Sequence, residues 1–141
     1  LDCELSSKDL LHWLSQEARR YQKGLIVSYH DFRKTPSPER LKKILQAAFR
    51  KKPWLTKIAV TARSQKDLSS LISFLARFRT QGLVVIAMGK IGKVSRILFP
   101  LLGSRITFGH LGSEAAPGQI PVSTLARKLR RLECHIPASV P

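Results

Sequence analysis

The chain has 141 residues, of which 43% are hydrophobic, and its formal net charge is +16. This length and composition are typical of one globular domain with a sizeable core and argue against a disordered chain. No segment approaches the roughly 18 consecutive apolar residues of a membrane span. No signal peptide is visible, so neither a membrane nor a secretory role is expected. Because there is no initiator Met, we expect a fragment or a cut product.

The cysteines and the basic residues limit the function classes further. Cys3 and Cys134 fit no zinc or CxxC spacing, which favours a reducing compartment and a cytoplasmic protein. The high charge attracts nucleic acid, anionic membranes and small anions alike. We interpret it as solvated helix faces, or faces covered by an acidic segment, rather than as a nucleic-acid groove. The basic residues concerned are spread along the chain: Arg19, Arg20, Lys23; Arg40, Lys42, Lys43; Arg50, Lys51, Lys52; Arg127, Lys128, Arg130, Arg131.

The first two elements are a short strand at residues 1–5 and a helix. Ser6-Ser7-Lys8-Asp9 has the pattern of a capping box, so the helix is expected to run to about Gln22. Its buried face should carry Leu10, Leu11 and Leu14. Gly24 ends it, and the apolar run at 25–28 predicts a strand buried on both faces.

A polar loop at 31–37 leads to the next helix. Ser37 followed by Pro38 is typical of a helix start. The buried residues of this helix should be Leu41, Ile44, Leu45 and Ala48. A strand at 57–62 follows, and Ser64-Gln65-Lys66-Asp67 is a second capping box. Its helix should bury Leu68, Leu71, Ile72 and Leu75.

The last third of the chain repeats the pattern. Gly82 ends the preceding helix, and residues 83–88 predict another buried strand. Residues 94–102 indicate a short helix, 106–109 a fourth full strand, and 112–121 a loop of small residues. Residues 122–132 close the chain as a helix with Val122, Leu125, Leu129 and Leu132 inward.

Strand and helix thus alternate about five times, at the spacing of βα units. The fold class is α/β with a parallel sheet, and right-handed crossovers place the carboxyl ends of the strands on one face. Five units do not close a (βα)8 barrel. Either the sheet is open and doubly wound, or the chain is the second part of such a barrel.

His30 and Lys57 fall on successive strands, where side chains of one parallel sheet can face one pocket. A lysine in a strand buried on both sides is costly to keep charged, which favours a neutral, nucleophilic amine. A histidine can move protons near neutrality. The pair therefore suggests imine chemistry on a ketone, whereas a snorkelling lysine and a structural histidine are the plainer alternatives.

Several motifs in register carry a family resemblance. They are Ser28-Tyr29-His30-Asp31-Phe32 with Lys34-Thr35-Pro36; Lys57-Ile58-Ala59-Val60; Met88-Gly89-Lys90-Ile91-Gly92-Lys93-Val94-Ser95-Arg96; Phe99 to Gly103 with Ser104, Thr107 and Phe108; and Ala116-Pro117-Gly118-Gln119-Ile120. Together they resemble the type I 3-dehydroquinate dehydratases, over nearly the whole chain. The resemblance implies a TIM-type (βα)8 barrel of which this chain supplies about five units, starting near the fourth strand.

The resemblance also implies a reaction and its residues. Lys57 would form a Schiff base with 3-dehydroquinate, and His30 would act as general acid/base in its dehydration to 3-dehydroshikimate, a step of the shikimate pathway. The adjacent Asp31 either orients the histidine or caps its loop. Arg96 would bind the substrate carboxylate, because its planar fork suits a bidentate contact. No metal or organic cofactor is implied.

Further substrate contacts are implied on the wall and the lid of the site. Gln119 would contact the substrate from a lid loop that closes over it. Met88 would shape the pocket wall, although plain core packing is an equal alternative. Ala115 stands where the family usually has a serine, so one hydroxyl contact would be lost.

The missing first strands set further expectations. In the resemblance they carry the glutamate that positions the histidine, whereas Asp2 and Glu4 resemble acidic positions of the fourth strand. The chain alone is therefore expected to be a poor enzyme or none. The alternatives are an inactive remnant of the family or a basic nucleic-acid-binding module.

We expect residues 1–135 to form the barrel part and 136–141 to be a tail or linker. The partner expectations are a small-molecule substrate, no nucleic acid, no membrane, and either a homodimer or a complementing N-terminal half. A fusion to shikimate dehydrogenase would suit the tail. A sheet left open at its edges should also self-associate.

Overall fold

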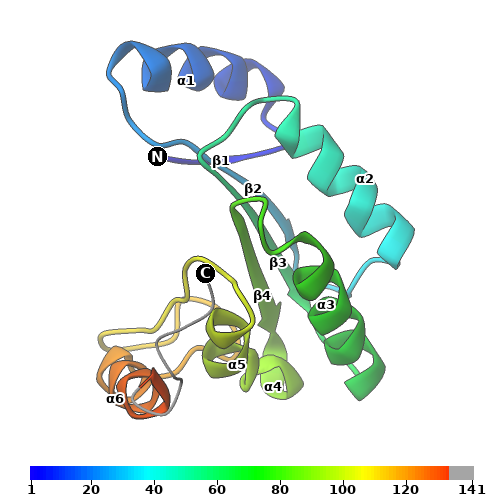
Figure 1. Ribbon diagram of the computed structural model, residues 1–141, viewed down its shortest axis with the longest axis vertical. Helices are drawn as coiled ribbons and strands as arrows, with labels where there is room; N and C mark the ends of the chain where they lie inside the picture. Colours follow the sequence, from blue (N-terminus) through cyan, green and yellow to red (C-terminus); the bar gives the residue numbers. More distant parts are fainter. Residues whose placement is uncertain (134–141) are drawn as a thin grey trace.

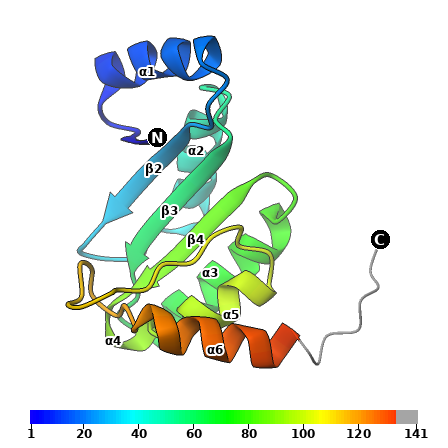
Figure 2. The ribbon, with the colours of Figure 1, turned by 90° about the vertical axis from the view of Figure 1, so that its left-hand side faces the viewer.

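The computed structural model describes residues 1–133. Cys134, His135 and the expected linker at 136–141 lie outside the described residues. Four strands form one sheet in chain order: β1 (Asp2–Glu4), β2 (Ile26–Asp31), β3 (Leu55–Thr61) and β4 (Leu83–Met88). All three pairings are parallel. The carboxyl ends of the strands therefore lie together, at the end where β2 to β4 point in Figure 2.

Helices connect the strands and follow the last one. They are α1 (Lys8–Arg20), α2 (Pro38–Phe49), α3 (Gln65–Phe78), α4 (Gly89–Gly92), α5 (Ser95–Leu101) and α6 (Val122–Glu133). Figure 1 shows α2 and α3 along one side of the sheet, with α5 beside β4 and α6 beside α5. No helix of residues 1–133 is long and apolar enough to cross a membrane.

The two faces of the sheet bury different side chains. On the helix-covered face, Ile58, Val60 and Val85 pack in one core with residues of α2 and α3, and Phe99 of α5 joins them. A second cluster beneath α1 includes Leu11, Cys3 and Val27. On the opposite face Ala59, Val84, Ile86 and Met88 pack with Ile106 and Phe108. Because side chains alternate along a strand, this second face receives every other residue, including those of the candidate site.

Most predicted elements are present, and the start of α2 is confirmed in detail. Ser37 precedes Pro38, and its hydroxyl accepts a hydrogen bond from the backbone N–H of Arg40 at 3.3 Å. The capping box at Ser64 and Asp67 is complete. The predicted inward residues of α2 are all buried: Leu41, Ile44, Leu45 and Ala48.

Three expectations about helices were wrong. Ser7, not Ser6, is the N-cap of α1, and its side chain makes no capping hydrogen bond. Leu10 is exposed, whereas Leu11 is fully buried, because α1 presents a narrower apolar face than predicted. Val122 and Leu132 of α6 are exposed, and Leu125 is the buried anchor.

The predicted strand at 106–109 is also wrong within the described residues, so the sheet has four strands rather than five. The Arg105 backbone N–H donates to the carbonyl of Leu83, and the Ser104 hydroxyl accepts from the N–H of Val85 at 3.0 Å. The Ser104 hydroxyl thus accepts from a backbone N–H of β4 that a fifth strand would need for its own pairing. The segment accordingly crosses the edge of β4 without forming a ladder.

Candidate active site

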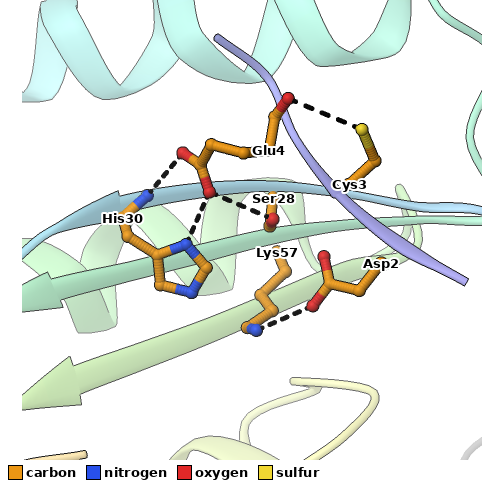
Figure 3. Close-up of polar contacts among 6 residues, drawn as sticks. All are labelled: Asp2, Cys3, Glu4, Ser28, His30 and Lys57. Atoms are coloured by element: carbon orange, nitrogen blue, oxygen red, sulfur yellow. Dashed lines mark hydrogen bonds and ion pairs between the residues drawn. The ribbon is translucent and has the colours of Figure 1, made fainter. Parts of the chain in front are cut away.

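The short strand β1 supplies two carboxylates to the face that bears the predicted catalytic pair. Asp2 pairs in register with Ile26 and Glu4 with Ser28, while Ser28 is opposite Lys57 on β3. Parallel register keeps these partners on one side of the sheet. Asp2, Glu4, His30 and Lys57 accordingly lie on one side of the sheet in Figure 3.

Lys57 is held by an ion pair. Its Nζ lies 2.9 Å from Oδ2 of Asp2, and the side chain of Lys57 is only 13% exposed. The ammonium also lies 5.2 Å from the ring centroid of Phe108, a favourable cation–π distance. The neutral amine stays a prediction; at rest the Lys57 side chain lies against a carboxylate and an aromatic ring.

The Asp2 carboxyl responds to the same contact. Burial by itself raises the pKa of Asp2, but hydrogen bonds from Lys57 and Ser28 and the positive charge of Lys57 outweigh it. The net result is a pKa below the ordinary value of 3.8. Asp2 is thus an ionised partner of Lys57 over the whole neutral range.

Glu4 holds His30 through two hydrogen bonds and makes a third to Ser28. Its Oε2 lies 2.7 Å from Nδ1 of His30 and accepts from the hydroxyl of Ser28 at 3.2 Å. Its Oε1 accepts from the backbone N–H of His30 at 3.1 Å. A carboxylate on Nδ1 fixes the tautomer that leaves Nε2 available for proton transfer.

The expected family glutamate of the missing strands stays a prediction, but this chain also has a glutamate that orients His30. Glu4, on the first strand of this chain, makes that contact itself. Asp31, the other candidate, instead caps its own loop, accepting from the backbone N–H groups of Arg33 and Lys34 at 2.8 and 3.0 Å.

Arg96 reaches the same region from α5. The Ser95 hydroxyl bonds to both the N–H and the carbonyl of Ala87, which fixes the start of α5 against β4. Gly92 permits this approach, because a Cβ there would overlap the carbonyl of Ala87. Arg96 is only 2% exposed, and its Nε and one Nη have no hydrogen-bond partner.

A buried arginine with free N–H donors is suited to bind an anion. Burial lowers the pKa of the Arg96 guanidinium, and the charge of Glu114 counteracts part of that shift. Buried donors without acceptors cost free energy, about 1–3 kcal/mol for each group. A carboxylate bound there would satisfy both free donors.

The loop at 112–121 covers this end of the sheet. Gly118 has a φ of +81°, and a Cβ there would lie 2.6 Å from the carbonyl oxygen of Gly89. The Gly89 N–H donates to the carbonyl of Pro117 at 3.1 Å. Gln119 is buried, and its Oε1 accepts from the N–H of Ala115 at 2.9 Å.

One cavity collects the predicted site residues. It has a volume of about 210 Å³, and its lining includes all six of them: His30, Lys57, Met88, Arg96, Ala115 and Gln119. Phe32 and Phe108 also line it. Phe32 stacks on His30 with ring centroids 6.0 Å apart. The sequence analysis assigned no site role to these two rings, although their places beside His30 and after Thr107 were within the quoted motifs.

Comparison with known proteins identifies the family of this chain. Residues 1–134 match the model of the family described as type I 3-dehydroquinase. The chain therefore belongs to the type I 3-dehydroquinase family.

The curated relatives named here are longer than this chain. The chain is 37% identical over 138 residues to a 3-dehydroquinate dehydratase of Methanosarcina acetivorans, covering 94% of the chain and 57% of the relative. A 3-dehydroquinate dehydratase of Hydrogenobaculum sp. is 36% identical, again with 57% covered. The chain thus spans a little over half the length of the curated relatives it matches.

Solved structures show the same partial coverage. The 3-dehydroquinate dehydratase of Geobacillus kaustophilus superposes with a TM-score of 0.88 at 29% identity, over 95% of this chain and 53% of that one. The Aquifex aeolicus enzyme gives 0.83 at 35% identity, over 92% and 58%. A dehydroquinate dehydratase and shikimate dehydrogenase from S. pombe gives 0.73 at 30%, over 96% and 26%. The parallel βα units are therefore part of the barrel that such enzymes adopt.

Proposed function

We propose that the chain is the catalytic part of a 3-dehydroquinate dehydratase, which converts 3-dehydroquinate to 3-dehydroshikimate through a Schiff base on Lys57. The observation that carries the proposal is one cavity that contains a paired lysine, a carboxylate-bound histidine and a buried arginine with free donors. This reaction belongs to the shikimate pathway of aromatic amino acid biosynthesis.

The first chemical step falls to Lys57. Its ammonium must lose a proton before the amine attacks the C3 ketone, and loss of water then gives the iminium. Oδ2 of Asp2, 2.9 Å from Nζ, is the group placed to accept that proton transiently and pass it on. The iminium is an electron sink, so it makes the neighbouring C2–H more acidic.

The proton transfers fall to His30. It takes a proton from C2 and returns one to the departing C1 hydroxyl, so that water leaves. Hydrolysis of the imine then consumes the water released when it formed, and the net change is loss of one water. Glu4 orients the ring throughout and stabilises the imidazolium between the two transfers.

Substrate binding falls to the remaining residues of the cavity. Arg96 holds the carboxylate in a bidentate contact, which compensates its unsatisfied donors. Gln119 contacts the substrate from the covering loop, Met88 forms the wall near the strand end, and Ala115 contributes its backbone. No serine hydroxyl is present at position 115, so we expect weaker substrate binding than a serine would give.

Borohydride trapping tests the proposal. With 3-dehydroquinate and borohydride, the chain should gain the mass of the reduced adduct on Lys57. Lys57→Ala should abolish the adduct, whereas Lys42→Ala, on the exposed face of α2, should retain it. Absence of any adduct on Lys57 at millimolar substrate would overturn the Schiff-base assignment.

Turnover is a separate question, because the chain covers little more than half of its relatives. We expect trapping with slow or absent dehydration by the chain alone, since groups contributed by the rest of a barrel would be needed to grip the ring hydroxyls. An inactive remnant would show neither trapping nor turnover. A cytoplasmic location and a fusion to shikimate dehydrogenase stay predictions.

A further inference from the structure

A basic cleft lies at the end of the sheet opposite the candidate active site. It has a volume of about 360 Å³ and is formed where α1 and α2 end and β2 and β3 begin. In Figure 1 this is the upper end of the molecule, from which the strand arrows point away. We propose that this cleft binds a nucleoside polyphosphate, a ligand that joins several negative charges to a flat aromatic base.

The charge of the cleft is the first argument. Four cationic side chains line it, Arg19, Lys23, Lys51 and Lys52, and none of its lining residues is acidic. Within residues 1–133 none of these four forms an ion pair; the one nearby pair joins Arg20 to Glu17 at 3.9 Å. Four neighbouring cations without counterions repel one another and attract a multiply charged anion.

Helix ends do not account for this accumulation of charge. The carboxyl ends of α1 and α2 point here, and cations near such ends are favourable. Each helix end is equivalent to roughly −0.5 of an elementary charge. Two ends offset about one of the four positive charges, which leaves an excess of about three. Di- and triphosphate groups carry a negative charge of that size.

An exposed indole beside the cations is the second argument. Trp54 is 63% exposed and lines the cleft together with Pro53 and Gly24. One face of its ring lies on Gly24, where an added Cβ would come within 2.8 Å of the indole. The ring is therefore supported on one side and open on the other. An open, supported indole is a platform on which a base can stack.

The site is independent of the proposed dehydratase chemistry. None of its lining residues lines the cavity of the candidate active site, and it lies at the amino ends of the strands. The cavity is within the range of small-molecule sites, which begins near 300 Å³. A nucleotide bound here would place its phosphates among the lysines and its base on Trp54.

Fluorescence titration tests the site directly. The chain has two tryptophans, so Trp13→Phe leaves Trp54 as the only indole. ATP in EDTA at fixed salt should quench Trp54, whereas adenosine alone and tripolyphosphate alone should each bind at least about tenfold more weakly. Trp54→Phe in the wild-type background, measured by calorimetry, should weaken ATP binding. Equal binding of tripolyphosphate and ATP, without quenching, would overturn the nucleotide assignment.

A charge-matched pair of variants separates the cleft from the overall field of the protein. Lys51→Glu with Lys52→Glu should weaken ATP binding at least about tenfold. Arg127→Glu with Lys128→Glu on α6 changes the net charge by the same amount and should weaken it less than about threefold. Equal loss in both variants, or tighter binding of a single-stranded oligonucleotide that both weaken equally, would show nonspecific polyanion binding and overturn the proposal.

Discussion

At the scale of single residues, the two reactive side chains each have a carboxylate of their own. Asp2 pairs with Lys57, and Glu4 pairs with His30. The carboxylates are two positions apart on β1 and their partners lie on different strands. One carboxylate contacts the amine and the other contacts the imidazole, so the two contacts can be tested one at a time.

Glu4→Gln should impair His30 without abolishing the Lys57 adduct. The amide keeps the shape of the side chain but no longer stabilises an imidazolium, so dehydration should fall at least about tenfold. We expect borohydride trapping to continue, as measured by mass spectrometry. Turnover is measured separately, after adding a polypeptide that supplies the part of a relative that this chain does not cover. Gln16→Ala, which removes only an exposed contact with His12, is the control. Unchanged turnover in Glu4→Gln would contradict the assigned role.

The Asp2–Lys57 pair should give a pH-dependent contribution to stability. Because the folded-state pKa of Asp2 lies below its ordinary value of 3.8, the pair stabilises the fold above that pH. This contribution is lost as pH falls through the folded pKa. Asp2 is partly exposed, so the expected cost of Asp2→Asn at pH 7 is only about 0.5–1 kcal/mol. Urea unfolding should show the difference at pH 7, and the difference should shrink as the pH falls below 3.8; a constant difference would contradict this.

At the scale of elements, two serines with similar surroundings in sequence differ in the structure. Ser64 caps α3 by accepting from the N–H of Asp67, three residues on. Ser7 caps α1 without a side-chain hydrogen bond, and the residue three positions on is Leu10. In the turn after β1 the Ser7 N–H donates to the carbonyl of Glu4, and the N-cap is Ser7, one residue later than predicted.

Paired alanine substitutions should reveal this difference. Ser64→Ala removes a formed cap and should cost about 1 kcal/mol of unfolding free energy. Ser7→Ala removes no capping bond and should cost less than about 0.3 kcal/mol. Denaturant unfolding of both variants, with unchanged m-values, makes the comparison. Equal losses would mean that the two caps are energetically alike.

The same elements show what local sequence could predict. Their places on successive parallel strands predicted that His30 and Lys57 can face one pocket, and both line one cavity. The apolar run at 106–109 resembled a strand, but the Ser104 hydroxyl takes up backbone groups of β4. Glu4 was missed as the partner of His30 because 26 residues separate them, and only the pairing of β1 with β2 brings them together.

At the scale of the whole molecule, one edge of the sheet is open. Within residues 1–133, β1 pairs with β2 alone, whereas the segment after α5 runs along the edge of β4. Large apolar side chains such as Leu1, Leu10 and Trp13 are more than half exposed. An unpaired strand edge with exposed apolar groups is a surface for another chain.

We therefore expect the chain to associate. Sedimentation velocity from about 5 to 100 µM should show larger species growing with concentration. A polypeptide with the sequence of the part of a relative that this chain does not match should compete with this association and form a defined complex. A control polypeptide matching the covered part should not. A single monomeric species over the whole range, with or without the added polypeptide, would contradict the expectation.

The three residues of β1 have a kinetic consequence. Within residues 1–133 the backbone ladder of this strand runs to β2 alone, so local opening of so short an edge strand needs less free energy than global unfolding. One such opening would remove the partners of Lys57 and His30 at the same moment. Amide hydrogen exchange at Leu5, whose N–H donates to the carbonyl of Ser28, should thus report how often the carboxylates of β1 separate from Lys57 and His30.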